Sequence, residues 1–434
     1  MAAHSADAPL SRPEADRLLA PLAAAAGIGL AVSGGADSLA LMRLAADWRH
    51  RLHPRLPMMV FTVDHALRPE AAAEAAQVAE WARAAGLEHA TLVWEGAKPR
   101  ADIAAAAREA RYRLLVEACA AHGLSHLVTA HHRDDQAETL LMRLARGSGV
   151  DGLAAMPEAS DWRGVVHLRP FLGTAKARLG ATLARFGQTW IEDPSNRDDR
   201  FARSRIRALM PDLAKEGLAS QRLAETARRM RRARAALESA AADLHRAVVR
   251  EDPAGFCRID REAWSSAPEE LGLRVLARLL MGIGGTDYPP RLERLERLYG
   301  DLTCETEAPA AATLNGCRVV RSPETVLVLR EAGRVGLPVV SLDAAPGVVW
   351  DRRFRIDRAG APAKGLTVRA LGADGVAVVR RTSELRAIPV VAARVAPAVF
   401  LGETLLAAPL VEARPGPYSG AEFTFSFVGA ARFA

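Results

Sequence analysis

Apolar and polar residues alternate in blocks along roughly the first 150 residues, as successive strands and helices require. Short apolar runs predict buried strands at residues 28–32, 58–63, 90–94 and 127–130. Segments with helical periodicity follow at about residues 71–85, 103–121 and 134–146. After the first run, Leu39, Leu41 and Met42 begin a further apolar helical face. This alternation predicts an α/β fold with a doubly wound parallel sheet.

The pattern changes at about residue 217. Leu223, Met230 and Leu237 recur at seven-residue spacing among many arginines, which predicts a long helix with an apolar seam and a basic face. Further helices are expected as far as about residue 302, and residues 311–330 are typical of a β-hairpin that turns at Ser322-Pro-Glu.

The last hundred residues consist of short strand-like runs separated by Gly and Pro. Such runs lie at residues 347–350, 366–369 and 403–408, and they predict a small β-rich domain. We therefore expect three domains: an N-terminal catalytic domain over residues 1–216, a mainly helical domain with a β-hairpin over 217–334, and the β-rich domain over 335–434.

Composition indicates a folded chain. Of 434 residues, 50% are hydrophobic and 25% are charged, and the length suggests two or three domains. The sequence shows no apolar run long enough to span a bilayer and no secretory leader, so we expect a cytoplasmic protein without a membrane partner. The four cysteines form no Cys-x-x-Cys pair, which argues against a zinc ribbon, a cysteine-held iron–sulfur cluster and a disulfide scaffold. The sequence leaves the oligomeric state open, a homodimer included.

The net charge of +7 and the pI near 9.7 are compatible with a polyanionic partner such as RNA. Only four of the 58 basic residues are lysine, so a compositional bias toward arginine explains part of the excess equally well. The arginines of the long helix, Arg228 and Arg232 among them, suit a phosphate backbone. They suit a solvated face balanced by Glu225 and Glu238 as well.

Residues 33–38, Ser-Gly-Gly-Ala-Asp-Ser, form the glycine turn between the first strand and its helix. Free N–H groups and the positive end of the helix dipole would meet an anion there. The turn lacks the Gly-Lys-Ser/Thr ending of the common nucleotide loop and carries Asp37 instead. A carboxylate beside phosphates indicates a bridging Mg²⁺, which makes Asp37 a candidate metal ligand. The alternative is that Asp37 caps the following helix.

The stretch Thr129-Ala-His-His-Arg-Asp-Asp-Gln-Ala-Glu-Thr139 holds the second candidate site. Its adjacent histidines lie too close in sequence to face one zinc ion easily. Asp135 and Glu138 are three residues apart on the expected helix, so both carboxylates lie on one face near its N-terminus. Paired carboxylates suit a cationic ligand. An acidic first turn that complements the helix dipole is the alternative.

The glycine turn resembles the signature of the PP-loop ATP pyrophosphatases, which split ATP between the α and β phosphates and activate a substrate with the AMP moiety. Together with residues 129–139 and Val63-Asp-His-Ala-Leu-Arg-Pro-Glu70, it resembles tRNA(Ile)-lysidine synthetases and the related tRNA cytidine 2-thiolation enzymes. The thiolation enzymes in question carry a Cys-x-x-Cys pair, which this chain lacks. Glu192-Asp-Pro-Ser-Asn196 and the arginine-rich segment 201–207 favour the lysidine family, although Ser204 stands where that family usually has Asn.

The resemblance implies a ligase that adds lysine to C2 of the cytidine at the first anticodon position of tRNA(Ile) with a CAU anticodon, through an adenylated tRNA. It implies ATP binding by Ser33, Gly34, Gly35, Ala36, Asp37, Ser38, His65 and His132, with Mg²⁺ on Asp37. Free L-lysine would bind Asp135, Glu138, Arg205 and Arg207. The tRNA would bind Arg111, Arg203, Arg228 and Arg232, and the catalytic residues would be Asp37, Asp135 and Glu138. Thiolation, or a synthetase acting on a small molecule, is the alternative function.

Overall fold

The computed structural model describes residues 8–99, 103–192, 200, 202–304, 311–333, 336–343, 347–359, 364–379, 388–409 and 423–429. The chain divides into two compact units, Met1–Arg234 and Ala235–Ala434. Hydrophobic clusters form within each unit. The division into three domains at residues 216 and 334 remains a prediction.

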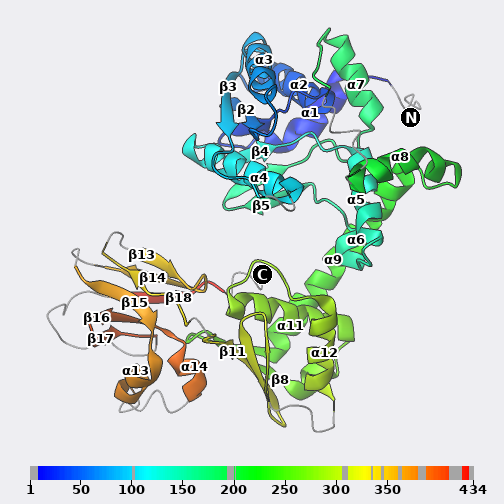
Figure 1. Ribbon diagram of the computed structural model, residues 1–434. Coiled ribbons are helices and arrows are strands. Elements are labelled where there is room, and N and C mark those ends of the chain that lie inside the picture. The colour runs from blue at the N-terminus through cyan, green and yellow to red at the C-terminus, as the bar shows by residue number, and fades with distance from the viewer. Residues whose placement is uncertain are drawn as a thin grey trace. The chain divides into compact units, whose positions relative to one another are not determined.

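A six-stranded sheet organises the first unit (Figure 1). Its strands lie in the order β3-β2-β1-β4-β6-β5 and are β1 Ile28–Ala31, β2 Met58–Asp64, β3 Glu88–Val93, β4 His126–Val128, β5 Ala159–Trp162 and β6 Val165–Leu168. Neighbouring strands pair in parallel, except that β5 pairs antiparallel with β6 at the edge. The predicted doubly wound α/β fold is confirmed.

Helices cover both faces of this sheet, with α2 and α3 on one face and α4 on the other (Figure 1). The helices of the first unit are α1 Arg12–Leu19, α2 Ala36–Leu52, α3 Ala71–Ala84, α4 Ile103–Ala121, α5 Arg133–Leu144, α6 Val150–Leu153, α7 Lys176–Arg185, α8 Ala202–Lys215 and the start of α9 Ser220–Val248. The predicted helices at 71–85, 103–121 and 134–146 correspond to α3, α4 and α5. The β5–β6 hairpin was not predicted.

The order of the strands reverses between β1 and β4. β1 pairs with β2 on one side and with β4 on the other, with Ile28 opposite both Met58 and His126. The carboxyl ends of β1 and β4 therefore lie side by side at the point where the strand order reverses, which is where doubly wound sheets bind ligands. The glycine turn follows β1, and the two histidines follow β4.

The second unit contains a five-stranded sheet in the order β7-β8-β11-β10-β9 and two smaller sheets, β12-β15-β16-β17 and β13-β14-β18. The first sheet comprises β7 Val249–Asp252, β8 Phe256–Asp260, β9 Ala311–Leu314, β10 Cys317–Arg321 and β11 Thr325–Arg330, accompanied by α10 Arg261–Ser265, α11 Glu269–Gly284 and α12 Leu292–Thr303. The smaller sheets comprise β12 Val340–Ser341, β13 Gly347–Trp350, β14 Phe354–Arg358, β15 Leu366–Ala370, β16 Pro397–Leu401, β17 Thr404–Ala407 and β18 Phe423–Phe427, with helices α13 Gly372–Val379 and α14 Val390–Arg394.

The predicted hairpin at 311–330 is a three-stranded meander. Its turn at Ser322 is confirmed between β10 and β11, but the first predicted strand breaks at Asn315 and Gly316. These two residues have φ of 54° and 74°, which is the left-handed pair of a type I′ turn. The strand-like runs at 347–350, 366–369 and 403–408 correspond to β13, β15 and β17. None of the helices formed by the described residues is both long and apolar enough to cross a membrane.

Candidate active site

The glycine turn lies between the end of β1 and the start of α2. Gly35 is the N-cap of α2, so the first N–H groups of the helix point out of its end. Ser38 Oγ donates a hydrogen bond to Gly35 O (2.9 Å) and accepts one from the Ser33 N–H (3.2 Å), which closes the turn. The N–H groups and the helix dipole together form an anion-binding site.

Gly34 is required at this turn for two reasons. Its φ is +86°, a conformation that other residues adopt only with strain. A Cβ added there would lie 2.7 Å from Ile191 Cδ1 and 3.2 Å from Val78 Cγ2. The Gly34 carbonyl also accepts a hydrogen bond from the Ile191 N–H (2.9 Å), which ties the turn to the segment after α7.

Three acidic residues surround the buried imidazole of His132, which is the N-cap of α5. His132 Nε2 lies 3.5 Å from Asp37 Oδ2 and 3.4 Å from Asp135 Oδ2, and His132 Nδ1 lies 3.7 Å from Asp134 Oδ2. The Asp135 carboxylate also accepts a hydrogen bond from the His132 backbone N–H (3.0 Å). The loops after β1 and β4 thus meet, as the positions of Asp37, His132 and Asp135 in the sequence predict.

The acidic neighbours raise the pKa of His132 above its ordinary value. Burial acts most strongly and by itself would lower this pKa, but the hydrogen bond to Asp37 and the charges of Asp135, Asp37 and Asp134 together outweigh burial. The carboxylates thus favour the charged form of the imidazole, and a charged imidazole would limit their mutual repulsion.

The His131 side chain lies beside Thr129 and His167, away from the carboxylates that surround His132. Its Nδ1 lies 2.8 Å from Thr129 Oγ1, which in turn lies 2.9 Å from His167 Nε2. Burial, together with Arg169, Arg108 and other cations, holds the pKa of His131 well below its ordinary value. The two adjacent histidines do not face a common point, in agreement with the sequence argument against a shared zinc ion.

Glu138 is paired with arginines that follow the segment 193–199. Its carboxylate, 4% exposed, accepts hydrogen bonds from Arg207 Nε (2.7 Å) and Arg207 Nη2 (3.0 Å), and Arg203 Nε lies 3.4 Å away. Arg203 also donates to Thr139 Oγ1 (3.0 Å). The hydrogen bond with Glu138 is the largest of the effects that raise the pKa of Arg207. Three predicted site residues of α5 and α8, Glu138, Arg203 and Arg207, thus lie together, one helical turn from Asp135.

The Arg205 side chain points away from Glu138, unlike those of Arg203 and Arg207 on the same helix, α8. Its Nη1 donates to the Arg200 carbonyl (3.1 Å), whereas Arg203 and Arg207, four residues apart on the same helical face, contact Glu138. Of the two arginines predicted to bind a carboxylate, Arg207 is therefore the one beside Glu138. Residues 193–196 of the predicted motif, and Phe201, lie outside the described residues.

His65 lies beyond β2, beside Trp94, at a ring-centroid distance of 6.0 Å with the rings perpendicular. Its Nδ1 is buried, and no residue in the described part of the chain forms a hydrogen bond with it. Burial, and to a lesser extent Arg111, lower the pKa of His65, so the ring is held neutral. A neutral ring with an unpartnered nitrogen is compatible with the predicted contact to ATP.

Arg111 is half-buried on α4. Its guanidinium carbon lies 5.7 Å from the Tyr112 ring centroid, and among the described residues no carboxylate pairs with it. Burial lowers the pKa of Arg111, and the charges of Arg108 and Arg203 add to that effect. Arg111 is thus more buried than an arginine on the solvent face of a helix.

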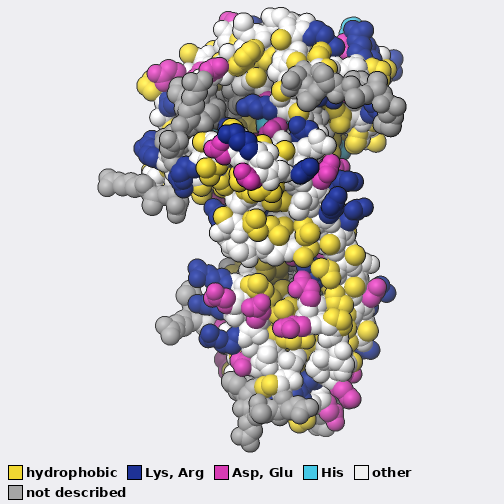
Figure 2. Space-filling view, turned by 90° about the vertical axis from the view of Figure 1, so that its right-hand side faces the viewer, with side chains coloured by type: hydrophobic (Ala, Val, Ile, Leu, Met, Phe, Trp, Pro, Cys, Tyr) yellow, Lys and Arg dark blue, Asp and Glu magenta, His cyan; other side chains and the backbone are white. Residues whose placement is uncertain are grey.

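On α9, Arg228 and Arg232 are exposed and lie on one face, as a contact with RNA would need. Other charges of the helix are used internally: Arg231 donates to the Met156 carbonyl (3.1 Å), and Glu238 pairs with Arg274 and Arg278 of α11. Basic and acidic side chains are interspersed over the face of the molecule drawn in Figure 2. The charge pattern alone therefore does not define an RNA-binding surface.

The residues around the glycine turn fit a magnesium ion. Asp37 Oδ1 is buried and has no hydrogen-bond partner among the described residues, which leaves a hard oxygen ligand available beside the phosphate-binding turn. Within the described part of the chain, no group of three or more His, Cys, Asp or Glu side chains is arranged to hold a metal on its own. An ion on Asp37 would complete its coordination with phosphate oxygens and water.

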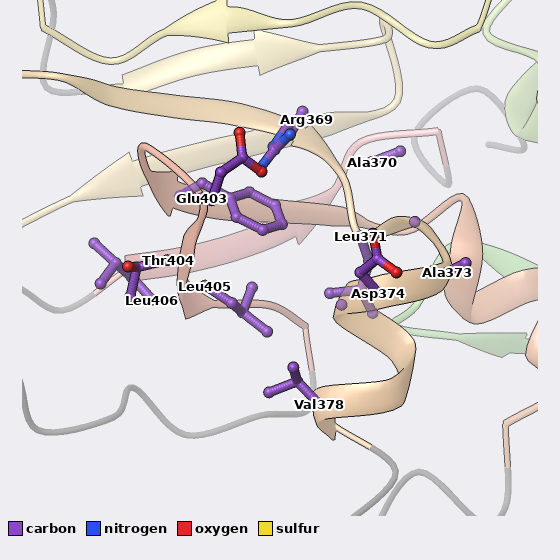
Figure 3. A pocket seen from close by; sticks show the side chains of 13 residues that line it. Arg369, Ala370, Leu371, Ala373, Asp374, Val378, Glu403, Thr404, Leu405 and Leu406 are labelled. Carbon is purple, nitrogen blue, oxygen red and sulfur yellow. The ribbon is translucent and has the colours of Figure 1, made fainter.

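A separate pocket of about 490 Å³ lies in the second unit, between α13 and the edge formed by β15, β16 and β17 (Figure 3). Arg369 and Glu403 pair with each other at its rim (2.7 Å). Leu371, Leu405 and Val378 supply apolar lining. The predicted catalytic residues belong to the first unit, and none of them lines this pocket.

Comparison with known proteins agrees with these features. Residues 10–213 match the PP-loop domain family. A tRNA(Ile)-lysidine synthase from Bradyrhizobium sp. strain BTAi1 is 48% identical over 310 residues, which are 68% of this chain and 86% of the relative. The chain belongs to the tRNA(Ile)-lysidine synthase family. The enzymes of that name from Bradyrhizobium diazoefficiens and Methylobacterium nodulans are 44% and 50% identical, over 82% and 68% of this chain and 98% and 87% of theirs.

A solved structure, the U34-tRNA thiolase NcsA from Methanococcus maripaludis with its 4Fe–4S cluster, aligns with a TM-score of 0.45 at 15% identity. The alignment covers 51% of this chain and 77% of that one.

In this member of the tRNA(Ile)-lysidine synthase family, two residues at the site were not predicted from the sequence. Lys98 places its ammonium 4.1 Å from the Trp94 ring centroid, near His65, whose pKa it helps to lower. The feature of the sequence that could have drawn attention to Lys98 is that lysine is rare in this chain, in which nearly all basic residues are arginine. Ile191, which binds the Gly34 carbonyl through its backbone, carries no such signal, because backbone hydrogen bonds leave little trace in side-chain identity.

Proposed function

We propose that the protein is a ligase that joins free L-lysine to C2 of the cytidine at the first anticodon position of tRNA(Ile) with a CAU anticodon, using ATP. The observation that carries this proposal is the position of Asp37, with its unpartnered carboxylate oxygen, beside His132 and Asp135, one turn of α5 from the Glu138–Arg207 pair. Family membership supports the same reaction.

The first step activates the base. With ATP phosphates at residues 33–38, the C2 oxygen of the cytidine attacks the α-phosphorus, and the bond to the bridging oxygen breaks to release pyrophosphate. The N–H groups of the turn and the dipole of α2 stabilise negative charge on the phosphates. Mg²⁺ held by Asp37 would neutralise part of that charge. His132 holds Asp37 and Asp135 at the site.

The second step transfers lysine. The ε-amine attacks C2, the C2–oxygen bond breaks, AMP leaves, and the new nitrogen loses a proton. Free lysine carries ammonium and carboxylate groups, which match the opposite charges of Glu138 and Arg207. We propose that Asp135 and Glu138 bind the amino groups and that Arg207 binds the carboxylate, so that lysine replaces the contact that Glu138 and Arg207 make with each other.

The remaining roles follow from this arrangement. Arg111 and Arg203 would bind the tRNA near the target base, and Arg228 and Arg232 would bind its backbone. An enzyme that modifies tRNA works where tRNA is used, so we place the protein in the cytoplasm. The residues of the proposed active site all lie in the first unit of one chain. A monomer and a homodimer would therefore carry the same active site.

The test is incubation of the purified protein with ATP, Mg²⁺, labelled lysine and the isoleucine tRNA, followed by counting label in precipitated RNA. Methionine tRNA, which has the same anticodon, and reactions without ATP are the controls. We expect label that is stable to mild base, which excludes an aminoacyl ester, and that is confined to the isoleucine tRNA. Pyrophosphate release without lysine incorporation would instead favour thiolation or a small-molecule acceptor.

A further inference from the structure

Trp162 is exposed on the first unit although it is one of the largest apolar side chains of the chain. It is the last residue of β5, just before a tight turn in which Arg163 and Gly164 have φ of 55° and 85°. The side chain is 38% exposed. Its ring lies on that of Tyr112, with the centroids 4.7 Å apart and the planes inclined by 35°. Tyr112 is buried, so one side of the indole is covered and the rest faces solvent.

Arginines surround this aromatic pair. The guanidinium of Arg108 lies 5.0 Å from the Tyr112 ring centroid and that of Arg111 lies 5.7 Å from it. Arg169 is buried and donates to His167 Nδ1 (2.9 Å), whose ring lies 5.3 Å from that of Tyr112. In the described part of the chain no carboxylate pairs with Arg108 or Arg111. Arg108 and Arg111 therefore keep positive charge beside the aromatic pair, and the carboxylate of Asp161, next to Trp162 in β5, accepts a hydrogen bond from the Gly164 N–H.

This aromatic and cationic surface is continuous with the proposed active site. Arg111 is close enough to Arg203 for their charges to interact, and Arg203 contacts Glu138. Single-stranded RNA is bound by stacking of bases on aromatic rings while arginines hold the phosphates, and any base can stack because each has an aromatic face. An anticodon loop supplies unpaired bases next to the one that is modified.

We propose that Trp162 and Arg108 form a binding site for a nucleotide of the anticodon loop other than the modified cytidine. The base stacks on the exposed part of the Trp162 indole, and Arg108 binds an adjoining phosphate. This inference rests on the proposed function. The site positions the loop, and it does not take part in either chemical step.

The test compares the affinity of the isoleucine tRNA for the protein and its Trp162→Ala, Trp162→Phe and Arg108→Ala variants, measured over a range of salt concentrations. We expect Trp162→Ala to weaken binding about fivefold to a hundredfold with an unchanged salt dependence, and Trp162→Phe to retain most of the affinity. Arg108→Ala should reduce the slope of log K against log salt by about 0.7, the amount for one phosphate contact of a single strand.

Leu52→Ala and Arg55→Ala are the matched controls, because both residues are exposed and lie between the last residue of α2 and the amino end of β2, away from the carboxyl ends of the strands. ATP binding by each variant checks that the fold is kept. Binding by Trp162→Ala within twofold of the parent, or an equal loss in Leu52→Ala, would overturn the inference while lysine incorporation by the parent protein stands. A parent protein that binds the tRNA through Trp162 but incorporates no lysine would overturn the proposed function instead.

Discussion

Both carboxylate oxygens of Glu138 accept hydrogen bonds from Arg207, at 2.7 and 3.0 Å, although 69 residues separate the two in the chain. Such a bidentate pair between a buried carboxylate and a half-exposed guanidinium leaves little room for a different partner. Under the proposed function, lysine binding would exchange this contact for two new ones of the same kind, one between Glu138 and an amino group and one between Arg207 and the carboxylate.

Glu138→Gln should impair lysine transfer more than adenylation, because the variant keeps the shape but leaves Arg207 without a counter-charge. We expect kcat/KM for lysine to fall about 30-fold or more, with pyrophosphate release from ATP and tRNA within a few-fold of the parent. Parallel assays of pyrophosphate and of labelled lysine in RNA measure the two effects. Glu80→Gln, on the exposed side of α3, is the control. Equal losses in both assays would contradict a role confined to lysine.

Asp37→Asn should abolish the first step, since the amide is a poor ligand for Mg²⁺. The rate of pyrophosphate release should fall at least about a hundredfold, and extra Mg²⁺ should restore only part of it. Titration of the rate with Mg²⁺ in parent and variant is the measurement. An unchanged rate in Asp37→Asn or Asp37→Ala would eliminate Asp37 as the metal ligand.

Gly34→Ala should damage the phosphate-binding turn through both conformation and crowding. Gly96 has the same φ of +86° but nothing within 4 Å of an added Cβ, so Gly96→Ala measures the conformational cost alone. That cost is about 1–2 kcal/mol in the free energy of unfolding. We expect Gly34→Ala to lose more than this and to raise KM for ATP. Chemical denaturation and ATP kinetics of the two variants give the comparison, and equal losses would show that Ile191 and Val78 simply move aside.

Acid should destabilise the first unit through His167. Burial, aided by Arg169 and other arginines, lowers the pKa of His167 to about 3. Between that value and the ordinary value near 6.5, the unfolded chain binds a proton that the folded chain does not, so stability falls as the pH falls through this window. Relative to His167→Gln, the parent should lose up to about 1.4 kcal/mol in the free energy of unfolding for each pH unit. Urea unfolding at several pH values tests this, with exposed His50→Gln as the control, and parallel pH profiles for parent and His167→Gln would refute it.

Local signals in the sequence were sufficient for most of the fold. The apolar runs and helical periodicities of the first unit match β1 to β4 and α3 to α5, because periodicity reflects which face of an element is buried. The break at Asn315 and Gly316 was missed although Asn-Gly is a strong hairpin signal, since the flanking apolar residues read as one continuous strand. The short β5–β6 hairpin was missed because its exposed strand has no clear alternation.

For the candidate site, the sequence predicted residues that belong to recognisable motifs, but not all of the contacts between them. The meeting of Asp37 with His132 follows from the rule that neighbouring parallel strands end at one edge. The choice of Arg207 over Arg205 as the partner of Glu138 depends on the helical phase of α8 relative to α5, which residue identities alone do not fix. The contact between Trp162 and Tyr112 joins residues 50 positions apart by tertiary packing, and side-chain identity does not encode it.

The start of α5 serves two purposes with the same groups. His132 caps the helix, the Asp135 carboxylate accepts a hydrogen bond from the His132 N–H, and the His132 imidazole lies between Asp37 and Asp135. If the first turn of α5 frayed, His132 would separate from the carboxylates of Asp37, Asp134 and Asp135. If His132 and Asp135 moved apart, the hydrogen bonds that begin the helix would break. The site is thus preorganised, so little reorganisation energy remains to be supplied when ATP arrives. Amide hydrogens of this turn should exchange among the slowest of any loop-to-helix junction in the molecule, and more slowly still once nucleotide is bound.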